Sequence, residues 1–114
     1  MKLIIAGSRT LNADIETIDM CLEFYDLEPT EIVCGMAKGI DLSGRNWSNF
    51  MMMAWREFPA HWDRYGKGAG HIRNKQMAEY ADALLLIWDG SSKGSANMKK
   101  TMEGLNKPVY EIIL

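Results

Sequence analysis

Short apolar runs alternate along the chain with longer segments in which apolar residues recur at helical spacing. The runs suit strands that are covered on both faces, and a period of about 3.6 residues suits helices that pack on a sheet. We therefore expect strands at residues 2–6, 31–34, 55–59, 83–88 and 109–114. We expect helices at residues 14–25, 41–53, 72–80 and 96–105, and a polar loop at residues 61–70. The alternation predicts an α/β fold, a three-layer sandwich with a mostly parallel sheet of about five strands.

The composition narrows the class of protein further. A length of 114 residues, 47% of them hydrophobic and 25% charged, suits one globular domain spanning residues 1–114. The net charge of -2 gives no overall basic surface, which argues against nucleic acid as a partner. No apolar run approaches the roughly 20 residues of a membrane helix, and residues 2–6 are too short for the apolar part of a signal peptide. We therefore expect a cytoplasmic protein with no membrane partner.

Cysteine, histidine and methionine offer few candidates for chemistry. The two cysteines lie in apolar stretches, and His61 and His71 have no third ligand at metal spacing, so we expect no cofactor and no metal. The run Met51–Met53 lies in the expected helix 41–53, and three consecutive residues cannot all face one core from one helix. We favour core filling together with an exposed subunit surface over a ligand role, and expect a homo-oligomer, a dimer or larger.

Three of the expected strands end in loops rich in glycine and polar residues. The loops are residues 7–9, 35–41 and 89–95. The carboxyl ends of parallel strands lie along one edge of a sheet, where ligands bind, so we expect the loops to converge. Glycine lets backbone N–H groups approach an anion, and the helix after each loop directs its positive dipole end to the same place. The loops predict a phosphate site, although no Walker A or G-x-G-x-x-G motif is present.

Polar side chains in these loops suit the same ligand. The hydroxyl groups that can donate to phosphate belong to Ser8, Ser91, Ser92 and Ser95. Arg9 and Lys38 offer positive charge, and Arg9 can make a bidentate contact to phosphate. Asp41 has two interpretations that the sequence leaves open: it accepts hydrogen bonds from ribose hydroxyls, or it caps the helix that follows.

A fourth candidate is the glycine-bearing stretch 66–74, which leads into a helix. Arg73 and Asn74 fall in the first turn expected for that helix, where an arginine opposes the helix dipole unless it meets an anion. A solvated arginine is the alternative. Trp62 and Trp88 lie beside the loops and are candidates for stacking on a base, with burial in the core as the alternative.

The order of these motifs resembles a known family. The motifs are Gly7-Ser8-Arg9, Gly35-Met36-Ala37-Lys38-Gly39-Ile40-Asp41, Phe58-Pro59-Ala60-His61-Trp62, Ala69-Gly70-His71-Ile72-Arg73-Asn74 with Met77, Ala81-Asp82-Ala83, and Trp88-Asp89-Gly90-Ser91-Ser92-Lys93-Gly94-Ser95. Nearly the whole chain is similar to the YspA-like, cpYpsA-related branch of the SLOG superfamily, which includes the Lonely Guy phosphoribohydrolases and DprA-type proteins. The resemblance implies a Rossmann-like fold and a nucleotide or nucleotide-derived ligand.

Two departures from the family patterns bear on function. Met36 and Ile40 replace smaller residues of the second loop, which alters the pocket that the family pattern would form. The phosphoribohydrolase motif has a glutamate where Met98 aligns, and methionine can serve neither as acid or base nor as stabiliser of an oxocarbenium-like state. We therefore lean against catalysis and assign no catalytic residue, with Asp41 and Asp89 as the candidates if the protein is an enzyme.

The residues and the resemblance favour a protein that binds a phosphorylated nucleotide, or a small molecule derived from NAD or ADP-ribose, as a sensor or sequestering protein. One alternative is an N-glycosidic hydrolase similar to the nucleoside 5′-monophosphate phosphoribohydrolases, and another is a single-stranded nucleic-acid module. The expected ligand-binding residues are Gly7, Ser8, Arg9, Gly35, Met36, Ala37, Lys38, Gly39, Asp41, Trp62, Arg73, Asn74, Asp89, Gly90, Ser91, Ser92, Gly94 and Ser95.

Overall fold

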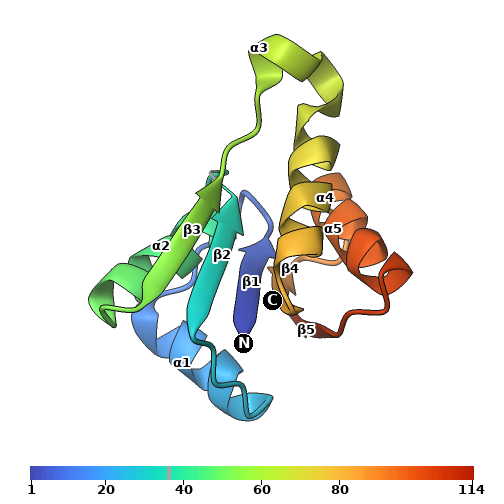
Figure 1. The fold of residues 1–114 in the computed structure, drawn as a ribbon. Coiled ribbons are helices and arrows are strands. Elements are labelled where there is room, and N and C mark those ends of the chain that lie inside the picture. Colours follow the sequence, from blue (N-terminus) through green and yellow to red (C-terminus); the bar gives the residue numbers. More distant parts are fainter. Residues whose placement is uncertain (36) are drawn as a thin grey trace.

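The computed structural model describes residues 1–35 and 37–114 (Figure 1). Within these residues, five strands form one sheet in the order β3-β2-β1-β4-β5, and every neighbouring pair is parallel. The strands are β1 (Lys2–Gly7), β2 (Glu31–Gly35), β3 (Ala54–Phe58), β4 (Ala83–Trp88) and β5 (Val109–Ile113). The helices are α1 (Ile15–Phe24), α2 (Ile40–Phe50), α3 (Trp62–Tyr65), α4 (Ala69–Tyr80) and α5 (Lys93–Gly104), with a 3-10 turn, η1, at Gly66–Gly68. The predicted α/β, Rossmann-like three-layer sandwich is confirmed.

Side chains of the central strand β1 alternate between two cores, one on each face of the sheet. Leu3 and Ile5 pack in the core that includes residues of α1 and α2, whereas Ile4 and Ala6 pack in the core that includes residues of α4 and α5. Figure 1 shows the two helix pairs on opposite sides of the sheet. Because β4 is also buried on both faces, both strands have nearly continuous apolar sequences.

The helices are short, and α1 shows how the sequence sets their limits. The Asp14 carboxylate caps α1 by accepting a hydrogen bond of 2.8 Å from the backbone N–H of Thr17. Ile18, Cys21 and Leu22 form its buried face. The helix predicted at residues 14–25 is thus confirmed to within one residue at each end. No helix in the described part of the chain is long and apolar enough to cross a membrane.

The segment 61–70, expected to be a polar loop, instead contains α3, η1 and the start of α4. Its glycines indicated a loop, but α4 begins at Ala69, a buried residue, three residues earlier than predicted. Arg73 is therefore the fifth residue of α4 rather than part of its first turn. The prediction that Arg73 and Asn74 lie in the first turn was wrong, and Arg73 does not oppose the helix dipole, because the dipole effect is confined to the first turn.

The predicted helix 41–53 also ends early, at Phe50. Met52 has a left-handed φ of 54°, and the backbone N–H of Met53 donates to the Ser48 carbonyl at 2.9 Å, an arrangement that terminates helices. Met53 packs against the core, whereas Met51 and Met52 are exposed. The premise that one helix carries all three methionines was wrong, and the homo-oligomer stays a prediction.

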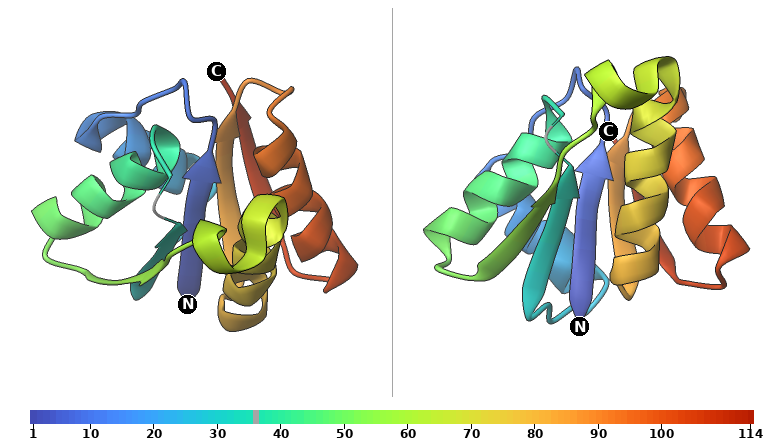
Figure 2. Two further views of the ribbon diagram at one scale, coloured as in Figure 1. Left: turned by 90° about the horizontal axis from the view of Figure 1, so that it is seen from above. Right: turned by 45° about the horizontal axis from the view of Figure 1, so that its top comes forward.

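The strand order reverses at β1. From β1 the chain builds outwards through β2 and β3, then returns to place β4 on the other side of β1. In sheets of this kind, ligands bind in the crevice beyond the carboxyl ends of the strands at the point of reversal. Figure 2 shows α3 and the first turns of α4 rising above this edge of the sheet.

Candidate functional site

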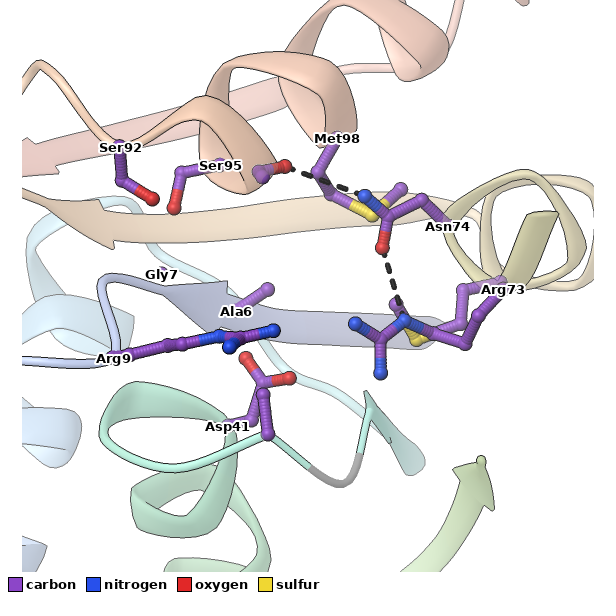
Figure 3. Close-up of a pocket in the computed structure, with 12 residues that line it drawn as sticks. Ala6, Gly7, Arg9, Asp41, Arg73, Asn74, Ser92, Ser95 and Met98 are labelled. Carbon is purple, nitrogen blue, oxygen red and sulfur yellow. Dashed lines mark hydrogen bonds between the residues drawn. The ribbon is translucent and has the colours of Figure 1, made fainter. Parts of the chain in front are cut away.

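A cavity of about 140 Å³ lies at the carboxyl-terminal edge of the sheet, where the strand order reverses (Figure 3). We call it the inner cavity. The lining comes from the end of β1 and the loop after it, from the start of α2 and the loop before it, from α4, and from the first two turns of α5 with its N-cap. The lining residues are Ala6, Gly7, Arg9, Ala37, Asp41, Arg73, Asn74, Met77, Ser92, Gly94, Ser95 and Met98. The predicted loops therefore do converge, together with Arg73 and Asn74 of α4.

Asp41 is the second residue of α2, and its side chain is only 4% exposed. Gly39 is the N-cap residue, so the interpretation of Asp41 as the cap was wrong, although a carboxylate in the first turn still suits the helix dipole. Burial raises the pKa of Asp41 to about 6. The charge of Arg73 and hydrogen bonds from the backbone N–H groups of Gly7 and Ala37 act in the opposite direction on this pKa. Asp41 thus presents a titratable carboxyl group to the inner cavity.

Two arginines flank this carboxyl group. In Figure 3 the side chain of Arg9 extends from the loop after β1 and that of Arg73 from α4, both towards the Asp41 carboxyl group. Arg73 is 8% exposed, and burial lowers the pKa of its guanidinium while the Asp41 charge raises it. Because two arginines face one aspartate, this part of an acidic protein carries net positive charge.

Two glycines of the loop before α2, Gly35 and Gly39, lie where a larger residue would clash with the residues that form the site. A Cβ atom on Gly35 would lie 2.3 Å from Nη1 of Arg73 and 2.7 Å from Oδ2 of Asp41. Gly39 has a φ of 76°, and a Cβ atom there would lie 2.4 Å from the carbonyl oxygen of Ser8. Neither glycine lines the cavity, so both shape the site without facing it.

The N-terminus of α5 forms the opposite wall of the inner cavity. Its N-cap residue, Ser92, makes no capping hydrogen bond through its side chain. Ser95 is 4% exposed, and its hydroxyl has no hydrogen-bond partner among the described residues. Figure 3 shows both hydroxyls on the side of the helix that faces Gly7. A buried polar group without a partner costs about 1–3 kcal/mol, so an acceptor in the cavity would be stabilised here.

Asn74 connects the two walls. Its amide nitrogen donates to the Gly94 carbonyl at 3.3 Å and to Oδ1 of Asn97 at 3.0 Å. Its Oδ1 accepts a hydrogen bond of 3.1 Å from Nε of Arg73. The position of the Arg73 guanidinium is therefore set relative to the N-terminus of α5.

Asp89, in the loop after β4, is exposed and lines neither the inner cavity nor the second cavity described below. Its Oδ1 accepts hydrogen bonds from the backbone N–H groups of Ser91 at 2.9 Å and Ser92 at 3.1 Å, and these bonds lower its pKa. The backbone N–H of Asp89 donates to Oγ of Ser8 at 3.1 Å. Ser8 and Asp89 thus brace the loops, and the N–H groups of Ser91 and Ser92 already have an acceptor.

Other predicted residues lie away from the inner cavity. Lys38 and Gly90 are exposed and line neither this cavity nor the second one described below. Trp88 is buried in the core, and its Nε1 donates to Oε2 of Glu111 at 2.6 Å, so core burial is the correct interpretation. Met36 was also predicted as a ligand-binding residue and lies outside the described residues.

A second cavity of about 280 Å³, the outer cavity, adjoins the first. It is lined by Arg9, Ala37, Pro59, Ala60, Trp62 and Arg73, so three residues line both cavities. Trp62, the first residue of α3, is 51% exposed. Of the two tryptophans singled out in the sequence, only Trp62 is therefore available to a ligand.

Five lining residues were not among the predicted ligand-binding residues, and one of them is Met98, which the sequence singled out only as the replacement for a glutamate. Ala6 and Met77 line the inner cavity, and Pro59 and Ala60 line the outer one. Met77 follows Arg73 by four residues, which places it on the same face of α4, so helical spacing was a usable signal. Pro59 and Ala60 follow directly after β3, another strand end at the same edge of the sheet.

Neither a metal site nor a related protein identifies a function for this chain. Within residues 1–35 and 37–114, no group of three or more histidine, cysteine, aspartate or glutamate residues lies close enough together to hold a metal ion. A scan against protein-family models gave no match, and searches of curated proteins and of solved structures gave none either.

Proposed function

We propose that this chain binds a phosphorylated nucleotide, or a small molecule derived from NAD or ADP-ribose, in the inner cavity, as a sensor or sequestering protein. The observation that carries the proposal is the buried, unpartnered hydroxyl of Ser95 at the N-terminus of α5, in the same cavity as Arg9 and Arg73. Hydroxyl groups, helix N-terminal N–H groups and guanidinium groups are the donors that bind phosphate in proteins.

The charge distribution supports an anionic ligand. The whole chain carries a net charge of -2, yet the charged residues lining the inner cavity are two arginines and one aspartate. The raised pKa of Asp41, about 6, also brings its carboxyl group closer to neutrality at physiological pH than an exposed aspartate. The resemblance to the YspA-like branch of the SLOG superfamily points to the same class of ligand.

Met98 supports binding without turnover. It is 1% exposed and lines the inner cavity, at the position where the phosphoribohydrolase motif has its glutamate. A thioether offers neither a proton nor a base to a glycosidic bond, and it cannot stabilise positive charge on a sugar ring.

Asp41 favours a second candidate function, an N-glycosidic hydrolase. Of the two aspartates considered for catalysis, it is the one that lines the cavity, and its pKa of about 6 suits acid–base chemistry near neutral pH. Asp89 accepts hydrogen bonds from its own loop instead. Release of free base from nucleoside monophosphates, lost in Asp41→Asn and kept in Asp89→Asn, would establish this function in place of simple binding.

Calorimetry tests the proposal. Titrations of AMP, ADP-ribose, cyclic ADP-ribose and NAD into the protein are expected to give saturable binding for at least one of them. Ser95→Ala should weaken that binding about tenfold, as expected when a hydrogen bond to a charged group is lost. Ser91→Ala is the matched control, because Ser91 is exposed and lines neither cavity. Absence of binding by every phosphorylated nucleoside would refute the proposal.

A further inference from the structure

We infer that the two cavities bind the two halves of one ligand: the inner cavity takes a ribose phosphate, and the outer cavity takes a planar base that stacks on Trp62. The inference rests on the proposed function and specifies its ligand as a nucleoside phosphate with the base attached. It also assigns a role to the outer cavity and to α3, because a ligand confined to the inner cavity would use neither.

The sizes of the cavities support a shared ligand. The inner cavity measures about 140 Å³ and the outer one about 280 Å³. Pockets for small molecules begin at roughly 300 Å³, so neither cavity alone reaches that size. Arg9, Ala37 and Arg73 line both cavities, so the two spaces adjoin and one ligand could contact both around these side chains.

The two cavities differ in chemistry. The inner cavity carries the hydroxyls of Ser92 and Ser95 and the carboxyl group of Asp41, which suit a phosphoryl group and sugar hydroxyls. The outer cavity lacks hydroxyl and carboxyl side chains among its described lining residues, where Pro59 and Trp62 provide apolar surface. A ligand with a polar, anionic end and an apolar, planar end matches this division.

Trp62 is placed to receive the planar end. Half of its surface is exposed although it belongs to a large apolar residue type, and α3 makes a short excursion above the sheet edge (Figure 2). A Cβ atom on Gly70 would lie 3.5 Å from Cη2 of Trp62, so the indole rests against the first turn of α4. Bases stack on such aromatic side chains and on guanidinium planes, which Arg9 and Arg73 supply at the junction.

The test compares a ligand that fills one cavity with ligands that fill both. Ribose 5-phosphate, AMP, GMP, CMP and UMP are titrated calorimetrically into the wild-type protein and into Trp62→Ala, Trp62→Phe and Ser95→Ala. Phe24→Ala is the control, because Phe24 is an exposed aromatic at the end of α1 and lines neither cavity. Thermal unfolding of each variant verifies that it is folded.

At least one nucleotide is expected to bind about tenfold more tightly than ribose 5-phosphate. Trp62→Ala should abolish this gain while changing the affinity for ribose 5-phosphate less than about twofold, and Trp62→Phe should keep most of the gain because it retains a stacking face. Ser95→Ala should weaken both kinds of ligand by a similar factor, since both carry the phosphoryl group.

Two results overturn the inference while leaving the proposed function in place. One is that ribose 5-phosphate binds and none of the four bases adds affinity. The other is that Trp62→Ala weakens ribose 5-phosphate as much as the nucleotides, or weakens neither. If the wild-type protein binds no phosphorylated compound at all, including the four nucleotides, ADP-ribose and NAD, the proposed function fails and the inference fails with it.

Discussion

The loops after β2 and after β4 look alike in sequence and differ in the structure. Both follow a buried strand, both contain glycines, and each carries one aspartate, at positions 41 and 89. Asp41 is buried in the inner cavity with a raised pKa, whereas Asp89 is exposed, lies off the cavity and has a lowered pKa. Asp89 accepts hydrogen bonds from the backbone N–H groups two and three residues after it, as aspartates in turns commonly do. Asp41 is instead the second residue of α2, and its carboxyl group lines the inner cavity.

Opposite pH dependence is the largest effect expected from this difference. The folded pKa of Asp41, about 6, exceeds its ordinary value of 3.8, so the folded state holds this proton more tightly than the unfolded chain. Its contribution to stability is therefore complete below about pH 4 and is lost as pH rises through 6, a change of about 3 kcal/mol. Asp41→Asn should remove this loss, so its free energy of unfolding should rise relative to wild type between pH 4 and 7.5.

Asp89→Asn is the matched control for that measurement. Hydrogen bonds from the loop lower the pKa of Asp89, so its contribution to stability is present above its ordinary pKa and lost as pH falls through the lowered one. Urea denaturation at several pH values should therefore show changes of opposite sign for the two variants, with the smaller change for the exposed Asp89. The same sign for both would contradict the contrast between the loops.

Substitution of a glycine from each loop region, Gly35 and Gly94, tests whether the two regions also differ in packing. Gly35→Ala places a methyl group against the buried Arg73 and Asp41 side chains and should reduce the free energy of unfolding by about 1–3 kcal/mol. It should also displace Arg73 and weaken nucleotide binding. Gly94 is the second residue of α5, the helix after the β4 loop, and a Cβ atom there meets nothing within 4 Å, so Gly94→Ala should leave stability unchanged or slightly higher. If urea denaturation gave equal losses in the free energy of unfolding for Gly35→Ala and Gly94→Ala, the contrast between the two loops would be contradicted.

Much of this arrangement could be predicted from the sequence, and the contrast between the loops could not. Continuous apolar runs such as residues 83–88 indicate where each parallel strand ends. The loops that follow these strands meet at the carboxyl-terminal edge of the sheet. Whether an aspartate accepts hydrogen bonds from its own loop or faces a cavity depends on backbone directions that residue types alone do not determine. The helical segment 62–68 was missed because glycines at alternate positions indicated a loop.

The smallest changes in stability are expected from alanine substitution of two serines, Ser8 and Ser95. Ser8 accepts a hydrogen bond from the backbone N–H of Asp89, so Ser8→Ala should destabilise the protein by about 1 kcal/mol. Ser95 has no partner among the described residues, so Ser95→Ala should leave the stability of the unliganded protein unchanged or raise it by a few tenths of a kcal/mol. Thermal unfolding without ligand measures both. A clear loss of stability in Ser95→Ala would mean that its hydroxyl has a structural partner and is not available to a ligand.

The inner cavity, where the strand order reverses, is the proposed binding site for a phosphorylated nucleotide. Amide NMR spectra recorded during titration with AMP, and separately with ADP-ribose, test the binding and its location together. The largest shifts are expected at Gly7, Gly94 and Ser95, with little change along α1, which contributes no residue to either cavity. Shifts that cluster on α1, or unchanged spectra at millimolar concentrations of both nucleotides, would contradict the claim.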